Sequence, residues 1–155
     1  MNRLIPLLLL TLGLALPLQA VPVKAAKDTP IPITVHRSPT CSCCGKWMEH
    51  MKHNGFAVAE IRAEDMDAIK RQHGVPETLK SCHTALVGGY VVEGHVPAED
   101  VKSMLNSKPT AIGISAPGMP VGSPGMEMGA KNDPYTVVQF DKSGNATVFH
   151  DYAGQ

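Results

Sequence analysis

The chain has 155 residues with 14 basic and 14 acidic side chains, so its formal net charge is zero. Nucleic-acid binding normally needs an excess of positive charge on one face, and the sequence therefore predicts no nucleic-acid partner. Without the N-terminal segment described next, about 130 residues remain, which is enough for one domain but not comfortably for two.

The N-terminus has the pattern of a secretory signal peptide. A short positive region, Met1-Asn2-Arg3, precedes an apolar run from Leu4 to Leu18. This run of about 15 residues is shorter than the roughly 20 needed to span a bilayer, although an uncleaved single-helix anchor is an alternative. We expect residues 1–20 to be a signal peptide, 21–30 an exposed leader and 31–155 one periplasmic domain, without membrane contact after cleavage.

The sequence of the first half of this domain predicts alternating strands and helices. Residues 31–37 are rich in β-branched side chains, and 38–40 break the strand immediately before a cysteine cluster. A helix follows from Cys44, because Cys44, Trp47, Met48 and Met51 have helical spacing, and Asn54-Gly55 ends it. Residues 56–61 predict a second strand, and 65–73 predict a second helix that Gly74 terminates.

The sequence of the second half of the domain predicts a hairpin, a third helix and a long loop. Strands at 84–87 and 90–93 are joined by two glycines, and Pro97 suits the first turn of the next helix. The order β-α-β-α-β-β-α is that of a thioredoxin-like α/β domain. Residues 106–134 then form a Gly/Pro-rich loop with methionines, longer than ordinary loops, and 135–152 predict a terminal hairpin that turns at 142–145.

The four cysteines fall into two short clusters, Cys41-Ser42-Cys43-Cys44 and Cys82-His83. The Cys-x-x-Cys spacing of Cys41 and Cys44 is used both by redox dithiols and by metal sites. Exported proteins usually contain structural disulfides, so two bridges are an alternative. Adjacent cysteines have Cα atoms about 3.8 Å apart, too close for an ordinary disulfide, which leaves Cys41 with Cys44 and Cys43 with Cys82 as the easy pairings.

The predicted fold brings the two clusters together. In thioredoxin-like domains, the segment before the third strand lies against the N-terminus of the first helix and usually ends in a cis-proline. Here Ser81-Cys82-His83 occupies that segment, so Cys82 and His83 are expected to face the first cluster. A redox enzyme needs only two thiols and an open substrate groove, and four converging thiols favour a metal centre.

The loop methionines favour copper over zinc. Thiolate and thioether ligands select Cu(I), and zinc rarely uses thioether. We expect Met119 and Met126 to be ligands in a rigid loop above the site, although methionines also fill gaps in apolar cores. His50 and His53 are predicted to lie on a solvated helix face, and His36 is a candidate for a position next to the ligands.

Several segments together resemble the CopG-type periplasmic copper-resistance proteins. The resemblance covers about residues 33–152 and rests on residues 41–47, 74–76, 81–85, 93–97 and 118–127. It implies a thioredoxin-like copper-binding domain in which cysteines bridge more than one Cu(I) ion. Cys41, Cys43, Cys44 and Cys82 match the cysteine positions of the family, and His83 and the methionine loop match its motifs.

The interpretation that follows is a periplasmic protein of copper resistance and homeostasis. Four thiolates around one Cu(I) ion leave excess negative charge, whereas several bridged ions balance it better. The expected partners are copper ions and other periplasmic copper-handling proteins, and Cu(I)/Cu(II) interconversion is a further expectation. Two alternatives stay open: a thiol-disulfide oxidoreductase or copper-site maturation factor, and a protein held together by two disulfides or a structural zinc.

Overall fold

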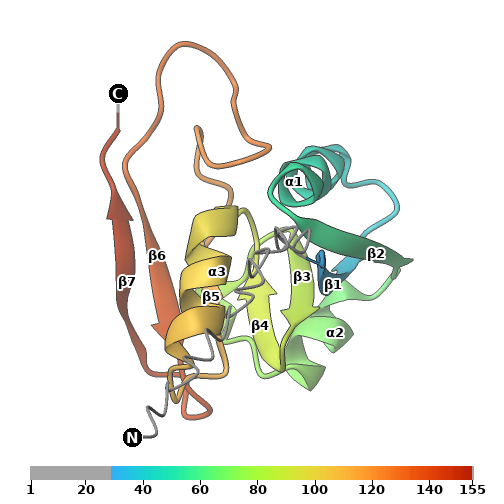
Figure 1. The fold of residues 1–155 in the computed structure, drawn as a ribbon, viewed down its shortest axis with the longest axis vertical. Helices are drawn as coiled ribbons and strands as arrows, with labels where there is room; N and C mark the ends of the chain where they lie inside the picture. Colours follow the sequence, from blue (N-terminus) through green and yellow to red (C-terminus); the bar gives the residue numbers. More distant parts are fainter. Residues whose placement is uncertain (1–28, 155) are drawn as a thin grey trace, which may run out of the picture.

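The structure is a computed structural model that describes residues 29–154 (Figure 1). The predicted signal peptide lies outside these residues. Seven strands form a single sheet in the order β2-β1-β3-β4-β5-β6-β7. The strands are β1 (Ile31–Arg37), β2 (Phe56–Arg62), β3 (His83–Val87), β4 (Tyr90–Glu93), β5 (Gly113–Ser115), β6 (Tyr135–Phe140) and β7 (Ala146–Tyr152). The helices are α1 (Ser42–His53), α2 (Met66–Gln72) and α3 (Ala98–Ser107), with a short 3-10 turn at Glu77–Leu79.

Strand pairing follows from the connections. β1 and β2 are parallel because α1 links them, whereas β3 pairs with β1 in the antiparallel direction. β3 and β4 form the expected hairpin, whose turn residues Gly88 and Gly89 have φ values of 55° and 86°. Positive φ at both central positions is the requirement of the tight hairpin turn, which explains the two glycines.

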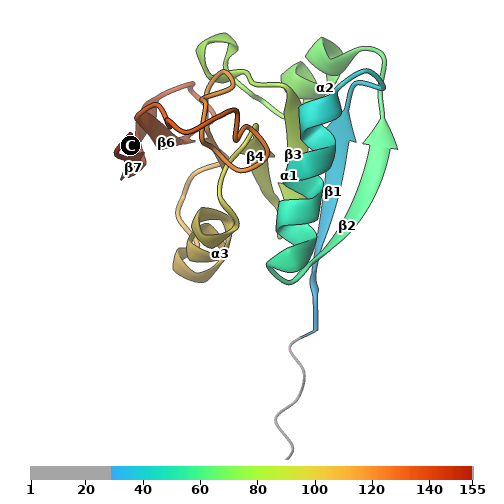
Figure 2. The same ribbon diagram turned by 90° about the horizontal axis from the view of Figure 1, so that it is seen from above.

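The helices cover both faces of the sheet. Figure 2 shows α1 and α3 on one face and α2 on the other. The main core lies under α1 and α3, where Trp47, Met51, Val101 and Met104 pack against apolar residues of the strands. A smaller apolar cluster, which includes Leu79, Val91 and Phe140, lies on the opposite face. The sheet is therefore buried on both sides near its centre.

The mixed α/β class and the predicted order of elements are confirmed, with two differences. The first helix begins at Ser42 rather than Cys44, with Cys41 at the N-cap position. The segment 106–134 was expected to have no element of its own, but it contains β5, which is parallel to β4 and antiparallel to β6. β5 thus joins the predicted C-terminal hairpin to the rest of the sheet.

The C-terminal hairpin is also attached to α3 by a buried carboxylate. Asp100 of α3 is 3% exposed, and its two oxygens accept hydrogen bonds from His150 Nδ1 and from the Tyr152 hydroxyl, both at 2.8 Å. The Tyr152 ring stacks on Tyr135 of the neighbouring strand. Among residues 29–154, no helix has the length and apolar character needed to cross a membrane.

Candidate metal centre

The fold brings both cysteine clusters to one end of the central strands. β1 leads directly into α1, so Cys41, Cys43 and Cys44 lie at the N-terminus of that helix. β3 begins opposite Arg37, the last residue of β1, which places Cys82 beside the first turn of α1. The Cys82 sulfur is 3.7 Å from the Cys44 sulfur and 3.9 Å from that of Cys43. The expected convergence of four cysteines is present.

Two of these cysteines are oxidised in the structure. Cys41 and Cys44 form a disulfide, one of the two pairings expected as easy. Cys43 and Cys82 are free thiols, and the Cys43 sulfur lies 3.6 Å from that of Cys41. The four sulfur atoms all lie within 4.8 Å of one another. In this state two thiols, rather than four, are available as ligands.

A second group of possible ligands shares Cys82 with the first. The Cys82 sulfur is 3.2 Å from His83 Nδ1 and 2.9 Å from His95 Nε2. His95 was not predicted as a site residue, because it is distant in sequence from both clusters. Its Nδ1–H donates to the Pro124 carbonyl at 2.8 Å, which leaves the Nε2 lone pair directed at Cys82. A carbonyl that orients the imidazole in this way is typical of metal-binding histidines.

His83 is fully buried in contact with the main core. Its ring packs on Trp47, with the ring centroids 4.4 Å apart, and the indole N–H of Trp47 donates to the Val96 carbonyl. The Nε2 atom of His83 has no hydrogen-bond partner among the described residues. Leaving a buried polar atom unpaired costs free energy. A bound ligand offers one way to compensate that cost.

The methionine loop contacts both cysteine segments. Gly118 pairs with Ser81, the residue before Cys82, and its N–H donates to the Lys80 carbonyl at 3.0 Å. At the other end, Gly125 has φ of +85°, and a Cβ there would lie 2.7 Å from the Trp47 nitrogen in α1. Glycine therefore permits the close approach of the loop to α1. The loop bridges the two halves of the site.

The two predicted methionine ligands differ in exposure. Met126 is 8% exposed and Met119 is 54% exposed. Their ligand roles, like those of the cysteines and His83, stay predictions. His50 does not lie free on a solvated face, because its Nε2 accepts the Ala98 N–H at the start of α3. His36 lies near His73, with the ring centroids 6.0 Å apart.

In the metal-free site, the surroundings of Cys82 favour its thiol form, and those of His83 and His95 favour neutral imidazoles. Burial, followed by the neighbouring Cys43, raises the pKa of Cys82 to about 12. Burial lowers the pKa of His83 well below its ordinary value, with further lowering by His95 and Lys70, and burial also lowers the pKa of His95. Both imidazoles are thus neutral and have a lone pair to donate, while a metal must displace the Cys82 proton.

The lowered histidine pKa values predict acid sensitivity of the metal-free domain. Below the ordinary histidine pKa of about 6.5, the unfolded chain binds protons that folded His83 and His95 do not, so stability is lost as the pH falls. We expect the free energy of unfolding in urea to decrease by about 1 to 2 kcal/mol between pH 6.5 and 5.5. His95→Gln should reduce this dependence, whereas replacing the exposed His53 by Asn should not. A flat profile over this interval would contradict the assignment.

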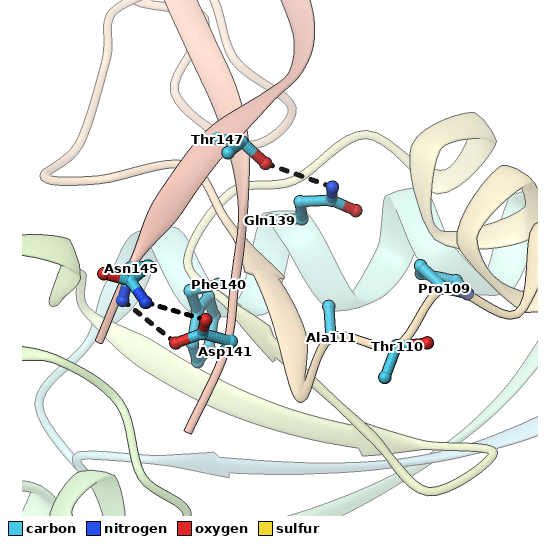
Figure 3. A pocket seen from close by; sticks show the side chains of 8 residues that line it. All are labelled: Pro109, Thr110, Ala111, Gln139, Phe140, Asp141, Asn145 and Thr147. Carbon is cyan, nitrogen blue, oxygen red and sulfur yellow. Dashed lines mark hydrogen bonds between the residues drawn. The ribbon is translucent and has the colours of Figure 1, made fainter. Parts of the chain in front are cut away.

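A separate surface pocket of about 240 Å³ lies between the loop after α3 and the β6–β7 turn (Figure 3). Its polar side chains mostly bond one another: Gln139 donates to Thr147, and Asn145 donates to Asp141. It contains no cysteine, histidine or methionine. The site with metal-binding chemistry is therefore the one around Cys82.

The fold is a mixed α/β domain, and its partly buried cysteines lie beside two buried histidines, so the chain belongs to the class of proteins with a candidate soft-metal site. Residues 79–126, which include Cys82, His83 and His95, match a family described as "Protein of unknown function, DUF411". No curated protein matches the chain.

Two solved structures of a copper resistance protein, CopG, resemble the whole domain. Form 1 is 47% identical with a TM-score of 0.76, and the match covers 80% of this chain and 98% of that one. Form 2 is 46% identical with the same TM-score, and the match covers 79% of this chain and 98% of that one. The chain belongs to the CopG-type family of copper-resistance proteins, as the sequence motifs predicted.

Proposed function

We propose that this protein binds Cu(I) in a cysteine-bridged site with more than one ion, as part of copper resistance and homeostasis in the periplasm. The observation that carries the proposal is the position of the Cys82 sulfur. It lies within 4 Å of two other cysteine sulfurs and also contacts two imidazoles. One thiolate can then bridge ions held by the cysteines of α1 and ions held by His83 and His95.

The type of donor supports copper in its reduced state. Thiolates and neutral imidazoles suit Cu(I), and His83 and His95 are neutral for the reasons given above. Buried thiolate charge needs compensation, which several monovalent ions provide better than one. In the proposal, Cys41, Cys43, Cys44 and Cys82 supply the thiolates, and Met119 and Met126 supply thioethers from the loop. Imidazole also tolerates Cu(II), which supports interconversion of the two copper states at this site.

The disulfide makes full loading depend on reduction. Two electrons and two protons convert the Cys41–Cys44 disulfide into two thiols, and only then do four sulfurs become available as thiolates. Copper capacity and the redox state of the cysteines are therefore coupled in this proposal.

The test is an anaerobic Cu(I) titration of the mature protein in its reduced and oxidised forms. We expect the reduced protein to bind more than one Cu(I) per chain and the oxidised protein to bind fewer ions. The single tryptophan contacts His83, so its fluorescence should be quenched as the site fills. A stoichiometry of one or less for the reduced chain would contradict the multinuclear site. A parallel Zn²⁺ titration tests the zinc alternative.

A second function, thiol-disulfide exchange, is favoured by one observation. The Cys41–Cys44 disulfide has the free Cys82 thiol 3.7 Å from Cys44, a position from which Cys82 could resolve a mixed disulfide. The raised pKa of Cys82 opposes this role, because the thiolate is the nucleophile. Disulfide reductase turnover by the metal-free protein, retained in Cys43→Ser, would favour exchange over copper storage.

A further inference from the structure

A buried ion pair lies on the face of the sheet opposite α1. Lys70 of α2 and Glu93 of β4 are 4% and 0% exposed, and the Lys70 ammonium donates to Glu93 Oε1. The other carboxylate oxygen, Oε2, accepts the Thr84 hydroxyl at 2.7 Å, and Thr84 Oγ1 accepts a further bond from Lys70 at 3.2 Å. Apolar replacements of such pairs are often equally stable, so stability alone does not account for this one.

The ion pair holds the backbone that carries Cys82. Glu93 Oε1 also accepts the N–H of Ser81 at 2.7 Å. Ser81 and Cys82 precede β3, and the isolated bridge from Ser81 to Gly118 is the local strand pairing there. The carboxylate therefore anchors the residue before Cys82 to a fixed point between α2 and the sheet.

The residues after Glu93 act on the same segment. Gly94 has φ of +75°, and a Cβ there would overlap the Ser81 side chain, so glycine is needed for the close approach. Its N–H donates to the His83 carbonyl at 2.9 Å. His95 then contacts the Cys82 sulfur. Three consecutive residues therefore contact this segment: Glu93 accepts the Ser81 N–H, Gly94 leaves room for the Ser81 side chain, and His95 contacts the Cys82 sulfur.

We propose that the Lys70–Glu93 pair is a positioning device that sets the place of the Cys82 sulfur through the Ser81 N–H. Neither residue is hydrogen-bonded to the ligand atoms, and the positioning contact is the one between Glu93 and the Ser81 N–H. The Lys70 charge also lowers the pKa of Cys82 and of His83, so the variants compared below share the same residue at position 70. The consequence for copper rests on the proposed function, whereas the effect on Cys82 itself can be measured without metal.

Two pairs of matched variants separate positioning from stability. Lys70→Met/Glu93→Gln removes both charges but keeps an amide oxygen that can accept the Ser81 N–H, and Lys70→Met/Glu93→Leu removes the acceptor as well. Ser81→Pro removes the N–H from the other side of the same contact, and its ring, which takes the place of the N–H, also displaces the Glu93 carboxylate from this segment. Lys80, at φ −61° and ψ 144°, already has a conformation that proline tolerates in the preceding residue. Ser81→Ala keeps the N–H and controls for loss of the hydroxyl.

The first measurement uses reduced, metal-free protein. We expect iodoacetamide to alkylate Cys82 faster in Lys70→Met/Glu93→Leu than in Lys70→Met/Glu93→Gln. We likewise expect faster alkylation in Ser81→Pro than in Ser81→Ala. The second measures transfer of Cu(I) to a chromophoric chelator, where loss of a supporting contact should speed release about tenfold. Equal Cys82 alkylation and equal copper release within both matched pairs would overturn the proposal. If the wild type binds no Cu(I), the copper function fails, and the alkylation rates alone decide the positioning role. If the leucine double variant does not fold, the Ser81 pair decides.

Discussion

Cys82→Ser is expected to reduce Cu(I) binding from more than one ion per chain to one or less. Cys82 is the residue that the sulfur cluster and the histidine group have in common, and within each group the possible ligand atoms lie within 4.8 Å of one another. Serine has nearly the same shape but offers a hard hydroxyl in place of a soft thiolate, so it cannot bridge Cu(I) ions. Anaerobic titration against a chromophoric chelator measures the change.

Met119→Leu provides the control for this experiment, because Met119 is an exposed residue of the loop. It should alter the affinity of the site without removing the bridge between ions. A Cys82→Ser protein that still binds as many Cu(I) ions as the wild type would contradict the central role of Cys82. The cluster would then be confined to the cysteines of α1.

Trp47→Ala is expected to lower the free energy of unfolding by about 3 to 5 kcal/mol. The Trp47 side chain is fully buried in the main core, donates to the Val96 carbonyl and supports the His83 ring. Alanine leaves a cavity, an unpaired carbonyl and an unsupported imidazole. Urea unfolding followed by circular dichroism measures the loss, because the variant has no tryptophan fluorescence.

Trp47→Phe separates these contributions. Phenylalanine keeps most of the apolar bulk and an aromatic ring against His83, but it cannot donate to Val96. We expect a clearly smaller loss of stability than in Trp47→Ala. Equal losses in the two variants would mean that the hydrogen bond, rather than packing, dominates at this position.

The main elements could be predicted because each has strong local patterning. The stripe formed by Cys44, Trp47, Met48 and Met51 matches the buried face of α1, and Gly88-Gly89 encodes the hairpin turn. β5 was not predicted because its three residues lie in a segment rich in glycine and proline, and its stability comes from the strands on either side. The local sequence of a three-residue strand does not indicate which distant strands it pairs with.

The candidate site was predicted only in part, for a similar reason. The cysteines and His83 form compact sequence motifs, and the α/β order indicated that the motifs meet. His95 belongs to a different segment, and its role depends on a hydrogen bond to Pro124 in the loop. Lys70 and Glu93 are charged residues that are usually exposed, so their burial follows from tertiary packing rather than from any local signal.

The site residues are far apart along the chain, and this separation couples copper binding to the stability of the native state. Cys41 to Cys44, Cys82-His83 and His95 meet only after β1, β3 and α1 have assembled. An unfolded chain cannot present this whole set together, so under the proposed function Cu(I) would bind the native state in preference. At a free copper concentration about 1,000 times the dissociation constant, such selective binding stabilises the native state by about 4 kcal/mol. The melting temperature of the domain should then rise with copper concentration, so its resistance to unfolding would follow the copper level of its surroundings.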